Sequence, residues 1–390
     1  MSQKADGFFL VFSEFFIYYP GNMNDIQERC VLIIGPTEFL GKTILTFLMK
    51  EGWKIIALAH PDERPAIEAA KKKLLRDENA PGSLEILWGD NTSPGAGLDS
   101  RTIDSISRKI HYIIHCPPLH LREKERYFIV TESIIKGTDQ IISLAHRFPN
   151  LKLLAHISSS FISGNYPGRF YEDWLDVGQA FYDPINKNHF IAESKLRNAS
   201  RSIPIIIFRT GLLAGNADTG ECDEDYGLVP FFKIITKYAR SLPRPLPLLS
   251  LDSEESIVSF SPNDFCARAI LNIIGSGENI GKTFCLVDPA SPSIRTFVDA
   301  VSDLMGRTCY RVPLDLITRL PMIEPMYMVE WIGFMAEKLK RSSFPLRFLF
   351  QRGDYDIANT RQALEGGTIE CPPFSQYIER LYRYYLTRYA

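Results

Sequence analysis

The chain has 390 residues, a formal net charge of −2 at pH 7, and 23% charged and 45% hydrophobic residues. This balance excludes the basic surface that nucleic-acid binding requires, and the length suffices for one large α/β domain with a second lobe. The seven cysteines are scattered without a Cys-x-x-Cys pair. That pattern argues against a disulfide framework or a zinc site and favours a reducing, cytoplasmic location.

The N-terminal residues 1–28 form a tail before the first strand. The segment from Phe8 to Tyr19 is aromatic and apolar, but polar residues interrupt it and it is too short to span a bilayer. It also lacks the features of a secretory signal. Three interpretations stand: a disordered tail, an interfacial or partner-binding segment, or an upstream extension of a protein whose natural start is Met23. We favour the extension and expect no membrane span.

From Cys30 onward, short apolar runs alternate with amphipathic stretches, which is the pattern of βαβ units around a parallel sheet. The runs are continuously hydrophobic because helices cover both faces of such a sheet. Strands are predicted at 30–34, 54–59, 84–88, 111–115, 151–158, 204–209 and 282–287. Helices are predicted at 41–51, 65–76, 100–109, 125–147, 188–200 and 262–275. The sequence therefore predicts an α/β fold with a doubly wound, Rossmann-type parallel sheet.

The composition changes after Arg209. Loop residues and closely spaced prolines fill 215–260, and aromatic side chains are frequent in 290–390. We predict a dinucleotide-binding domain and a smaller C-terminal substrate lobe, with these boundaries: 29–214 with 262–289 for the domain, and 215–261 with 290–390 for the lobe. The methionine- and aromatic-rich segment 320–340 suits a packed core and would also suit a long acyl chain.

Residues 31–41 have the strand–turn–helix pattern on which a dinucleotide pyrophosphate usually lies, because the amides of a helix N-terminus point at the anion. Gly35 and Gly41 take the first and last positions of a G-x-x-G-x-x-G turn. Glu38 stands where the middle glycine would be. A side chain and a negative charge are therefore expected near the pyrophosphate position.

Further landmarks follow the predicted strands in a fixed order: Gly89-Asp90, His115 to Pro118, Gly137-Thr138, Ser158 to Ser160 with Gly164, Ser194-Lys195, and Arg209-Thr210 with Gly215. Together with the glycine turn, they resemble the extended short-chain dehydrogenase/reductase family over about residues 30–290. Within that family, Thr219 to Glu221, Pro230 to Phe232 and the segment 283–289 resemble the branch of fatty acyl and thioester reductases. The resemblance implies a carbonyl or acyl thioester substrate in a cleft between the lobes. It also implies a homodimer face on the helices 125–147 and 188–200.

The resemblance assigns roles to individual residues. Those that would hold the cofactor are Gly35, Thr37, Phe39, Leu40 and Gly41 at the pyrophosphate, His60 at the ribose 2′-phosphate, Asp90 near the adenine, and Cys116 towards the ribose and nicotinamide. Ser159, five residues before Gly164, matches the catalytic serine that hydrogen-bonds the substrate carbonyl. Lys195 matches the lysine that holds the nicotinamide ribose and lowers the pKa of a catalytic tyrosine. The second strand ends at Ala59-His60 without an acidic residue, which favours NADP(H) over NAD(H).

The sequence departs from the family at the proton donor. The family places a tyrosine four residues before the lysine, so that both side chains share one helix face, but Ile191 stands four residues before Lys195. Ile134 likewise replaces an asparagine of the proton relay. Positioned proton donation contributes about 10² to 10⁴ in rate. Two hypotheses therefore stay open. One is an NADP(H)-dependent oxidoreductase that uses Ser159, Lys195 and a displaced tyrosine or water. The other is a catalytically degenerate member that binds nucleotide, acyl ligand or a protein partner without turnover. No metal site is predicted.

Overall fold

The computed structural model describes residues 29–119, 127–181, 184–224, 226–241, 248–251, 257–307, 309–312 and 353–390. The predicted N-terminal tail, the closely spaced prolines at 243, 245 and 247, and the methionine-rich segment 320–340 lie outside the described residues.

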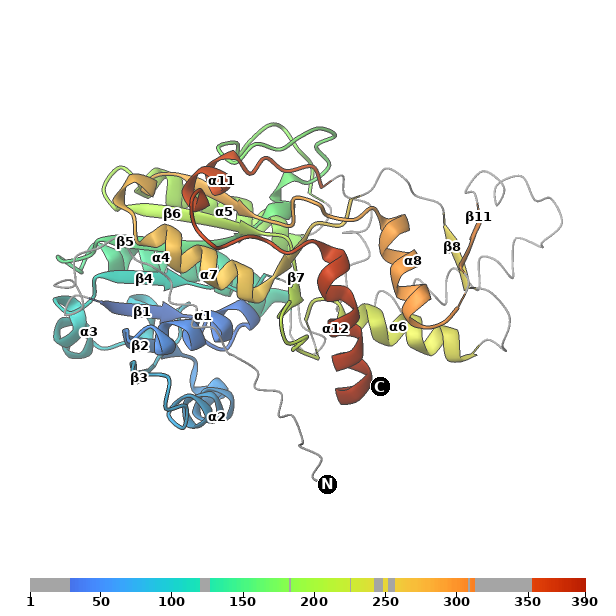
Figure 1. The fold of residues 1–390 in the computed structure, drawn as a ribbon. Helices are drawn as coiled ribbons and strands as arrows, with labels where there is room; N and C mark the ends of the chain where they lie inside the picture. Colours follow the sequence, from blue (N-terminus) through green and yellow to red (C-terminus); the bar gives the residue numbers. More distant parts are fainter. Residues whose placement is uncertain are drawn as a thin grey trace, which may run out of the picture.

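A seven-stranded parallel sheet forms the centre of the fold (Figure 1). Its strands are β1 (Cys30–Ile34), β2 (Lys54–Ala59), β3 (Ser83–Trp88), β4 (Tyr112–His115), β5 (Leu153–Ser159), β6 (Ile205–Thr210) and β10 (Thr283–Leu286). Their order across the sheet is β10-β6-β5-β4-β1-β2-β3, so the winding reverses between β1 and β4. The predicted doubly wound fold is confirmed, and each predicted strand agrees with an observed one to within two residues.

Helices cover both faces of the sheet. One face carries α1 (Phe39–Lys50), α2 (Arg64–Leu74) and α7 (Asn263–Ile274), and the other carries α3 (Ser100–Ser107), α4 (Tyr127–Ala145) and α5 (Pro184–Ala199). Successive residues of β1 alternate between the two cores. Val31 and Ile33 pack with the first group of helices, whereas Leu32 and Ile34 pack with the second. This double burial explains why the strands are hydrophobic without alternation.

Several short elements lie between the strands and helices. In the described part of the chain, the short helical turns are η2 (Pro61–Glu63), η3 (Pro94–Gly97), η4 (Ser160–Ser163) and η5 (Gly277–Asn279). Other short elements are parallel strand pairs that the sequence analysis did not predict: β7 (Leu212–Gly215) with β9 (Phe260–Pro262), and β8 (Leu248–Leu251) with β11 (Cys309–Val312). Each of these strands has only three or four residues, too few to show a period.

The helices that we assign to the second lobe lie beside the sheet (Figure 1). They pack around a cluster of aromatic side chains. These helices are α6 (Val229–Ser241), α8 (Ile294–Leu304) and α12 (Phe374–Arg388). Part of the segment that we assign to this lobe lies against the sheet instead. In α11 (Ala358–Leu364), the Thr360 hydroxyl donates to the Cys285 carbonyl of β10 at 3.3 Å. None of the helices in the described part of the chain is long and apolar enough to cross a membrane.

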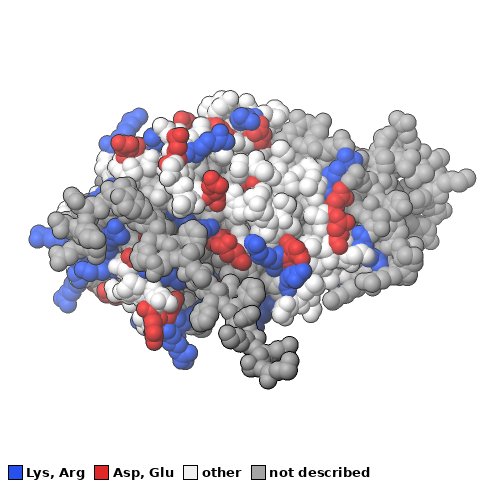
Figure 2. Space-filling model, viewed as in Figure 1, with Lys and Arg blue, Asp and Glu red and all other residues white. Residues whose placement is uncertain are grey.

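Acidic and basic side chains are interspersed over the face of the molecule that Figure 2 shows. This distribution agrees with the near-zero net charge of the sequence.

We predict that Gly41→Ala lowers the free energy of unfolding by about 1–3 kcal/mol, a usual cost of overpacking. A Cβ atom at Gly41 would lie 2.1 Å from the Gly35 carbonyl oxygen, a backbone atom that cannot move aside alone. Urea denaturation followed by circular dichroism measures the loss. The control is Gly277→Ala, because its added Cβ meets nothing within 4 Å. Equal stabilities of the two variants would contradict the tight packing of this turn.

Candidate functional site

The glycine turn after β1 has the close backbone packing of a dinucleotide-binding fold. Gly35 has a φ of +75°, and a Cβ atom there would lie 2.0 Å from the Cys116 carbonyl oxygen. Gly41, in the first turn of α1, approaches Gly35 equally closely. Both positions therefore require glycine for the packing of β1, β4 and α1, whatever ligand the turn binds.

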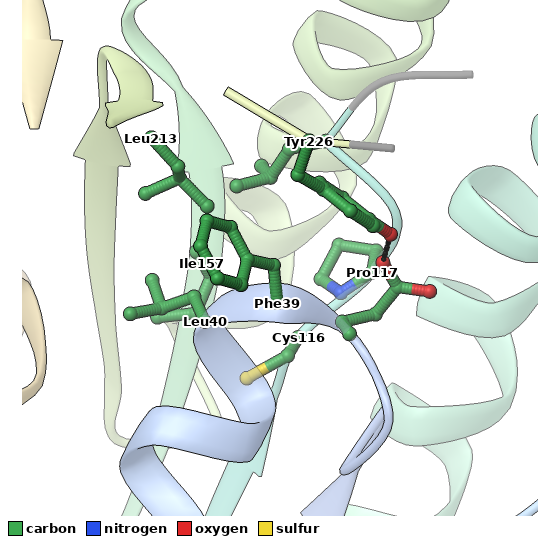
Figure 3. Close-up of a pocket in the computed structure, with 9 residues that line it drawn as sticks. Phe39, Leu40, Cys116, Pro117, Ile157, Leu213 and Tyr226 are labelled. Atoms are coloured by element: carbon green, nitrogen blue, oxygen red, sulfur yellow. Dashed lines mark hydrogen bonds between the residues drawn. The ribbon is translucent and has the colours of Figure 1, made fainter. Parts of the chain in front are cut away.

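Glu38 occupies the centre of this turn. Its side chain is only 8% exposed, and its carboxylate accepts a hydrogen bond from the Tyr226 hydroxyl at 2.5 Å. The Tyr226 ring also packs on Phe39, with ring centroids 5.4 Å apart. Figure 3 shows the tyrosine ring lying over the first turn of α1. The side chain at the middle position of the turn is therefore buried and held by Tyr226.

The loop that carries Tyr226 is attached to α1 at a second point. Lys42, one helical turn after Glu38, donates a hydrogen bond to Asp223 at 3.2 Å. Gly227 follows with a φ of +61°, and a Cβ atom there would lie 2.1 Å from the Leu213 carbonyl oxygen. The loop is thus packed closely against β7 on one side and α1 on the other.

A small pocket lies between this loop and the carboxyl ends of the strands (Figure 3). Its cavity volume is about 10 Å³, which is room for about one water molecule. Most of its lining is apolar: Phe39, Leu40, Cys116, Pro117, Leu119, Ile157 and Leu213, with Glu38 and Tyr226 as the acidic and phenolic members. Burial and the nearby Glu38 raise the pKa of Cys116, so this thiol stays protonated and acts as an apolar lining group.

The adenosine end of the predicted site contains an acid that the sequence analysis did not select. Glu63 accepts hydrogen bonds from the Thr37 hydroxyl of the glycine turn and from the His60 backbone N–H, the latter at 2.9 Å. The His60 imidazole accepts a hydrogen bond from the Asp62 N–H. A carboxylate therefore lies between the end of β2 and the turn, four residues later than the position that the sequence analysis inspected.

Asp90, predicted to lie near the adenine, is engaged in a turn of its own. Its carboxylate accepts hydrogen bonds from the backbone and hydroxyl of Thr92, both at 2.8 Å, and from the Ser93 hydroxyl at 2.7 Å. Although burial works in the opposite direction, these hydrogen bonds lower the pKa of Asp90 below its ordinary value. The side chain is an ionised turn cap.

Ser159 lies at the carboxyl end of β5, as predicted, and begins the 3₁₀ turn η4. Its side chain is 3% exposed and accepts a hydrogen bond from the Phe161 N–H at 3.2 Å.

In the described part of the chain, no tyrosine hydroxyl is hydrogen-bonded to Ser159 in place of the missing family tyrosine. The Tyr355 hydroxyl lies 3.1 Å from the Ser163 hydroxyl, and burial raises the pKa of Tyr355. Tyr171 is 45% exposed.

A buried ion pair fixes the rotation of α5 on the sheet. The Glu193 carboxylate is fully buried, and it accepts hydrogen bonds from the Ser158 hydroxyl at 2.6 Å and from Nη2 of Arg209 at 2.7 Å. Arg209 also donates to the carbonyls of Glu172 and Trp174. A buried charge pair of this kind is tolerated only when both partners are fully hydrogen-bonded. Glu193 therefore identifies the side of α5 that faces the sheet.

Lys195 and Ile191 lie on the other side of α5. Each is two residues from Glu193, which corresponds to about 160° around a helix of 3.6 residues per turn. The Lys195 ammonium pairs with the Asp139 carboxylate of α4 at 2.7 Å, and both side chains are partly exposed. The sequence analysis predicts that Lys195 holds a cofactor ribose beside Ser159, and in the structure the ammonium group is paired with Asp139. The structure directs the lysine to α4, away from the sheet-facing side of α5.

Ile185 and His189 repeat the same four-residue spacing nearer the sheet-facing side. His189 is about 40° around the helix from Glu193 and about 6 Å closer to the helix start. Its Nε2 lies 3.0 Å from the carbonyl oxygen of Pro118, which follows the carboxyl end of β4. Ile185 packs in a small apolar cluster with Val130, Ile134 and Ala192. The Ile134 side chain, which replaces the relay asparagine, belongs to this contact between α4 and α5.

Three buried histidines lie close together: His115 at the end of β4, His156 in β5 and His189 in α5. Nδ1 of His115 and Nδ1 of His156 are 3.1 Å apart, so one ring donates and the other accepts. Burial lowers the pKa of His115 to about 3 and that of His189 to about 4, and lowers the pKa of His156 well below its ordinary value. All three rings are therefore neutral at physiological pH. Among the residues that the structure describes, Nε2 of His115 and Nε2 of His156 have no hydrogen-bond partner.

A dinucleotide is the cofactor that this fold implies. Gly35 and Gly41 provide the close backbone approach that it needs, but Glu38 places a carboxyl group at the middle position of the turn, immediately before α1. Two like charges 4 Å apart repel by about 4 kcal/mol at an effective dielectric constant of 20. The residues at this turn therefore do not fit a dinucleotide pyrophosphate. No group of three or more His, Cys, Asp or Glu side chains is placed to hold a metal ion within the described ranges.

Comparison with known proteins agrees with the fold. The family described as Male sterility protein matches residues 33–270. A linear gramicidin synthase of Brevibacillus parabrevis is 23% identical over 90% of this chain and 7% of its own length. The fatty acyl-CoA reductase wat of Drosophila melanogaster is 24% identical over 52% of this chain and 46% of its own length. The chain thus spans less than half the length of either relative.

Among solved structures, the terminal R domain from the myxalamid PKS-NRPS biosynthetic pathway has a TM-score of 0.75 and 22% identity. The alignment covers 92% of this chain and 91% of that domain. A likeness at this identity supports the fold of the whole described chain, including the second lobe.

We predict that stability falls steeply below pH 6.5. Because the folded-state pKa values of the three buried histidines are lowered, the unfolded chain binds more protons at acid pH. The stability that these neutral rings provide is complete above the unfolded pKa of about 6.5 and is lost as the pH falls towards 4. Each ring contributes up to about 1.4 kcal/mol per pH unit in that window. Urea denaturation at several pH values measures the slope.

The variant His189→Gln keeps a side-chain donor for Pro118 and removes one titrating ring, so a shallower slope is expected. Exposed His146 provides the control, and His146→Gln should keep the wild-type slope. Identical slopes for both variants would show that the buried ring does not govern acid stability.

Proposed function

The chain belongs to the family described as Male sterility protein, and we propose that it is a member with a reductase fold but without hydride-transfer chemistry. In this proposal it binds an acyl chain or acyl thioester at the carboxyl edge of the sheet and does not reduce it. The fold is that of extended short-chain dehydrogenases and thioester reductases.

The observation that carries the proposal is the rotation of α5. Glu193 is buried against Ser158 and Arg209. With α5 in this orientation, the two residues spaced by four that lie nearest the carboxyl ends of the strands are Ile185 and His189. We propose that these two residues, rather than Ile191 and Lys195, occupy the positions of the family's tyrosine and lysine. An aliphatic side chain donates no proton, and a neutral imidazole bonded to Pro118 provides no positive charge for a cofactor ribose.

The apolar lining of the pocket supports an acyl ligand. Ligand sites of this kind are mostly hydrophobic, with a few polar groups that orient the ligand. Phe39, Ile157 and Leu213 provide the hydrophobic surface, and Glu38 and the Tyr226 hydroxyl are the polar groups of the lining. The relative named as a fatty acyl-CoA reductase acts on an acyl group by its name, which favours the same ligand class here.

A second candidate is an NADP(H)-dependent oxidoreductase that reduces a carbonyl or acyl thioester. The close packing of Gly35 and Gly41 favours it, because this is the backbone approach that a dinucleotide needs. Exposed His60 and Arg64 would favour the 2′-phosphate of NADP(H). Glu63, hydrogen-bonded to Thr37, would instead favour the ribose hydroxyls of NAD(H).

Two further predictions from the sequence accompany this proposal. One is a homodimer formed through α4 and α5, whose outer side carries the partly exposed Lys195–Asp139 pair. The other is a cytoplasmic location, based on the scattered cysteines.

We expect no oxidation of NADPH above the protein-free background when the wild-type chain is mixed with acyl-coenzyme A thioesters or an aliphatic aldehyde. The reason is that no proton donor lies beside Ser159 in the described structure. Absorbance of NADPH measures the rate. Turnover that is lost in Ser159→Ala would overturn the proposal and establish the reductase.

Two variants, each in a Glu38→Gly background, test the rotation of α5. Ile185→Tyr combined with His189→Lys installs a Tyr-x-x-x-Lys pair near the sheet-facing side. Ile191→Tyr alone installs the same pair with native Lys195 on the outer side. Reductase activity is expected to rise by about 10² or more only in the first variant, the usual contribution of positioned proton donation. A rise only in the second would show that the family alignment on Lys195 is correct.

A further inference from the structure

We propose that the N-terminus of α1 is closed to dinucleotides by the chain's own Glu38 carboxylate, which the Tyr226 loop holds in place. This inference goes beyond the proposed function, because a protein without turnover can still bind a cofactor. It concerns binding, whereas the proposed function concerns proton donation and the rotation of α5.

The first step is electrostatic. The N-terminus of a helix carries a partial positive charge and unpaired backbone N–H groups, which is why it attracts phosphate. Glu38 immediately precedes α1, and its carboxylate is buried there. A carboxyl group thus already stands at this end of the helix, hydrogen-bonded to Tyr226 rather than to the helix amides. A second anion would meet this carboxylate in a site that is largely shielded from water.

The second step is steric. The Tyr226 ring packs on Phe39 and its hydroxyl donates to Glu38, so the phenol covers the first turn of α1 (Figure 3). The Lys42–Asp223 pair attaches the same loop one helical turn further along. Because Gly227 packs its backbone directly on the Leu213 carbonyl, this loop has little room to move away. Binding of a dinucleotide would require the loss of all these contacts.

The third step is the charge at the other side of the turn. Glu63 accepts a hydrogen bond from Thr37, so carboxylates lie both at the middle of the glycine turn and at its adenosine end. The Glu38 carboxylate disfavours the pyrophosphate, whereas the Glu63 carboxylate disfavours a 2′-phosphate and could still accept from the ribose hydroxyls of NAD(H). The excluded class is therefore the anionic dinucleotides, and the apolar side chains beside Tyr226 would not repel a neutral group.

Calorimetric titration of the purified chain with NADPH and with NADH tests the inference. The wild type is expected to bind neither at micromolar concentration. Glu38→Gly removes the charge and the side chain together and is expected to tighten NADPH binding at least about tenfold. Glu38→Gln keeps the size of the side chain and an acceptor for Tyr226, so a smaller gain is expected. Glu78→Gly, at an exposed acid far along the sequence, is the matched control and should behave as wild type.

Low-micromolar binding of NADPH by the wild type would overturn the inference, as would a Glu38→Gly variant that binds no more tightly than Glu78→Gly. If circular dichroism shows that Glu38→Gly is not folded, Glu38→Gln decides the question, and no gain in that variant overturns the inference. Binding without oxidation of NADPH by the wild type would leave the proposed function intact. Oxidation of NADPH would overturn the proposed function itself.

Discussion

The buried Glu193 carboxylate is the constraint on which the rest of the site depends. A charge removed from water must be paired and hydrogen-bonded, or the helix that carries it cannot pack. Arg209 and Ser158 provide those partners from two neighbouring strands, so α5 has one rotation on the sheet. That rotation directs Lys195 towards α4 and places His189 under the segment after β4. This one ion pair therefore determines which side chains of α5 lie near the carboxyl ends of the strands.

The glycine turn shows that two glycines of a family pattern are required for packing alone. Gly35 and Gly41 are required because the backbones of β1, β4 and α1 approach one another closely, with or without a cofactor. The middle position has no such requirement, since Glu38 has ordinary extended backbone angles before the helix. A side chain there is sterically permitted, and its charge then becomes available to Tyr226. The departures from the family pattern at α1 and α5 are separated in sequence, and our two proposals assign them to different steps, binding and proton transfer.

Most of the fold could be predicted from the sequence, because a strand covered on both faces must be continuously apolar over its length. The prediction for the start of α5 was less accurate. The helix begins at Pro184, a good first residue of a helix, whereas the sequence analysis predicts a start at residue 188. Ile191 stands four residues before Lys195, yet this spacing alone does not say which side of the helix faces the sheet. The pairing of Glu193 with Arg209 carries that information. The Tyr226–Glu38 contact spans 188 residues and depends on loop packing that no local pattern encodes.

A double-mutant cycle between Glu193 and Arg209 tests the central claim most directly. Glu193→Gln, Arg209→Met and the combined variant are compared with wild type by urea denaturation, and the coupling free energy is expected to be about 2 kcal/mol or more. The parallel cycle of Lys195→Met with Asp139→Asn should give less than about 1 kcal/mol, because that pair is partly exposed. A Glu193–Arg209 coupling below about 0.5 kcal/mol would contradict the account, since α5 would then lack the anchor that sets its rotation.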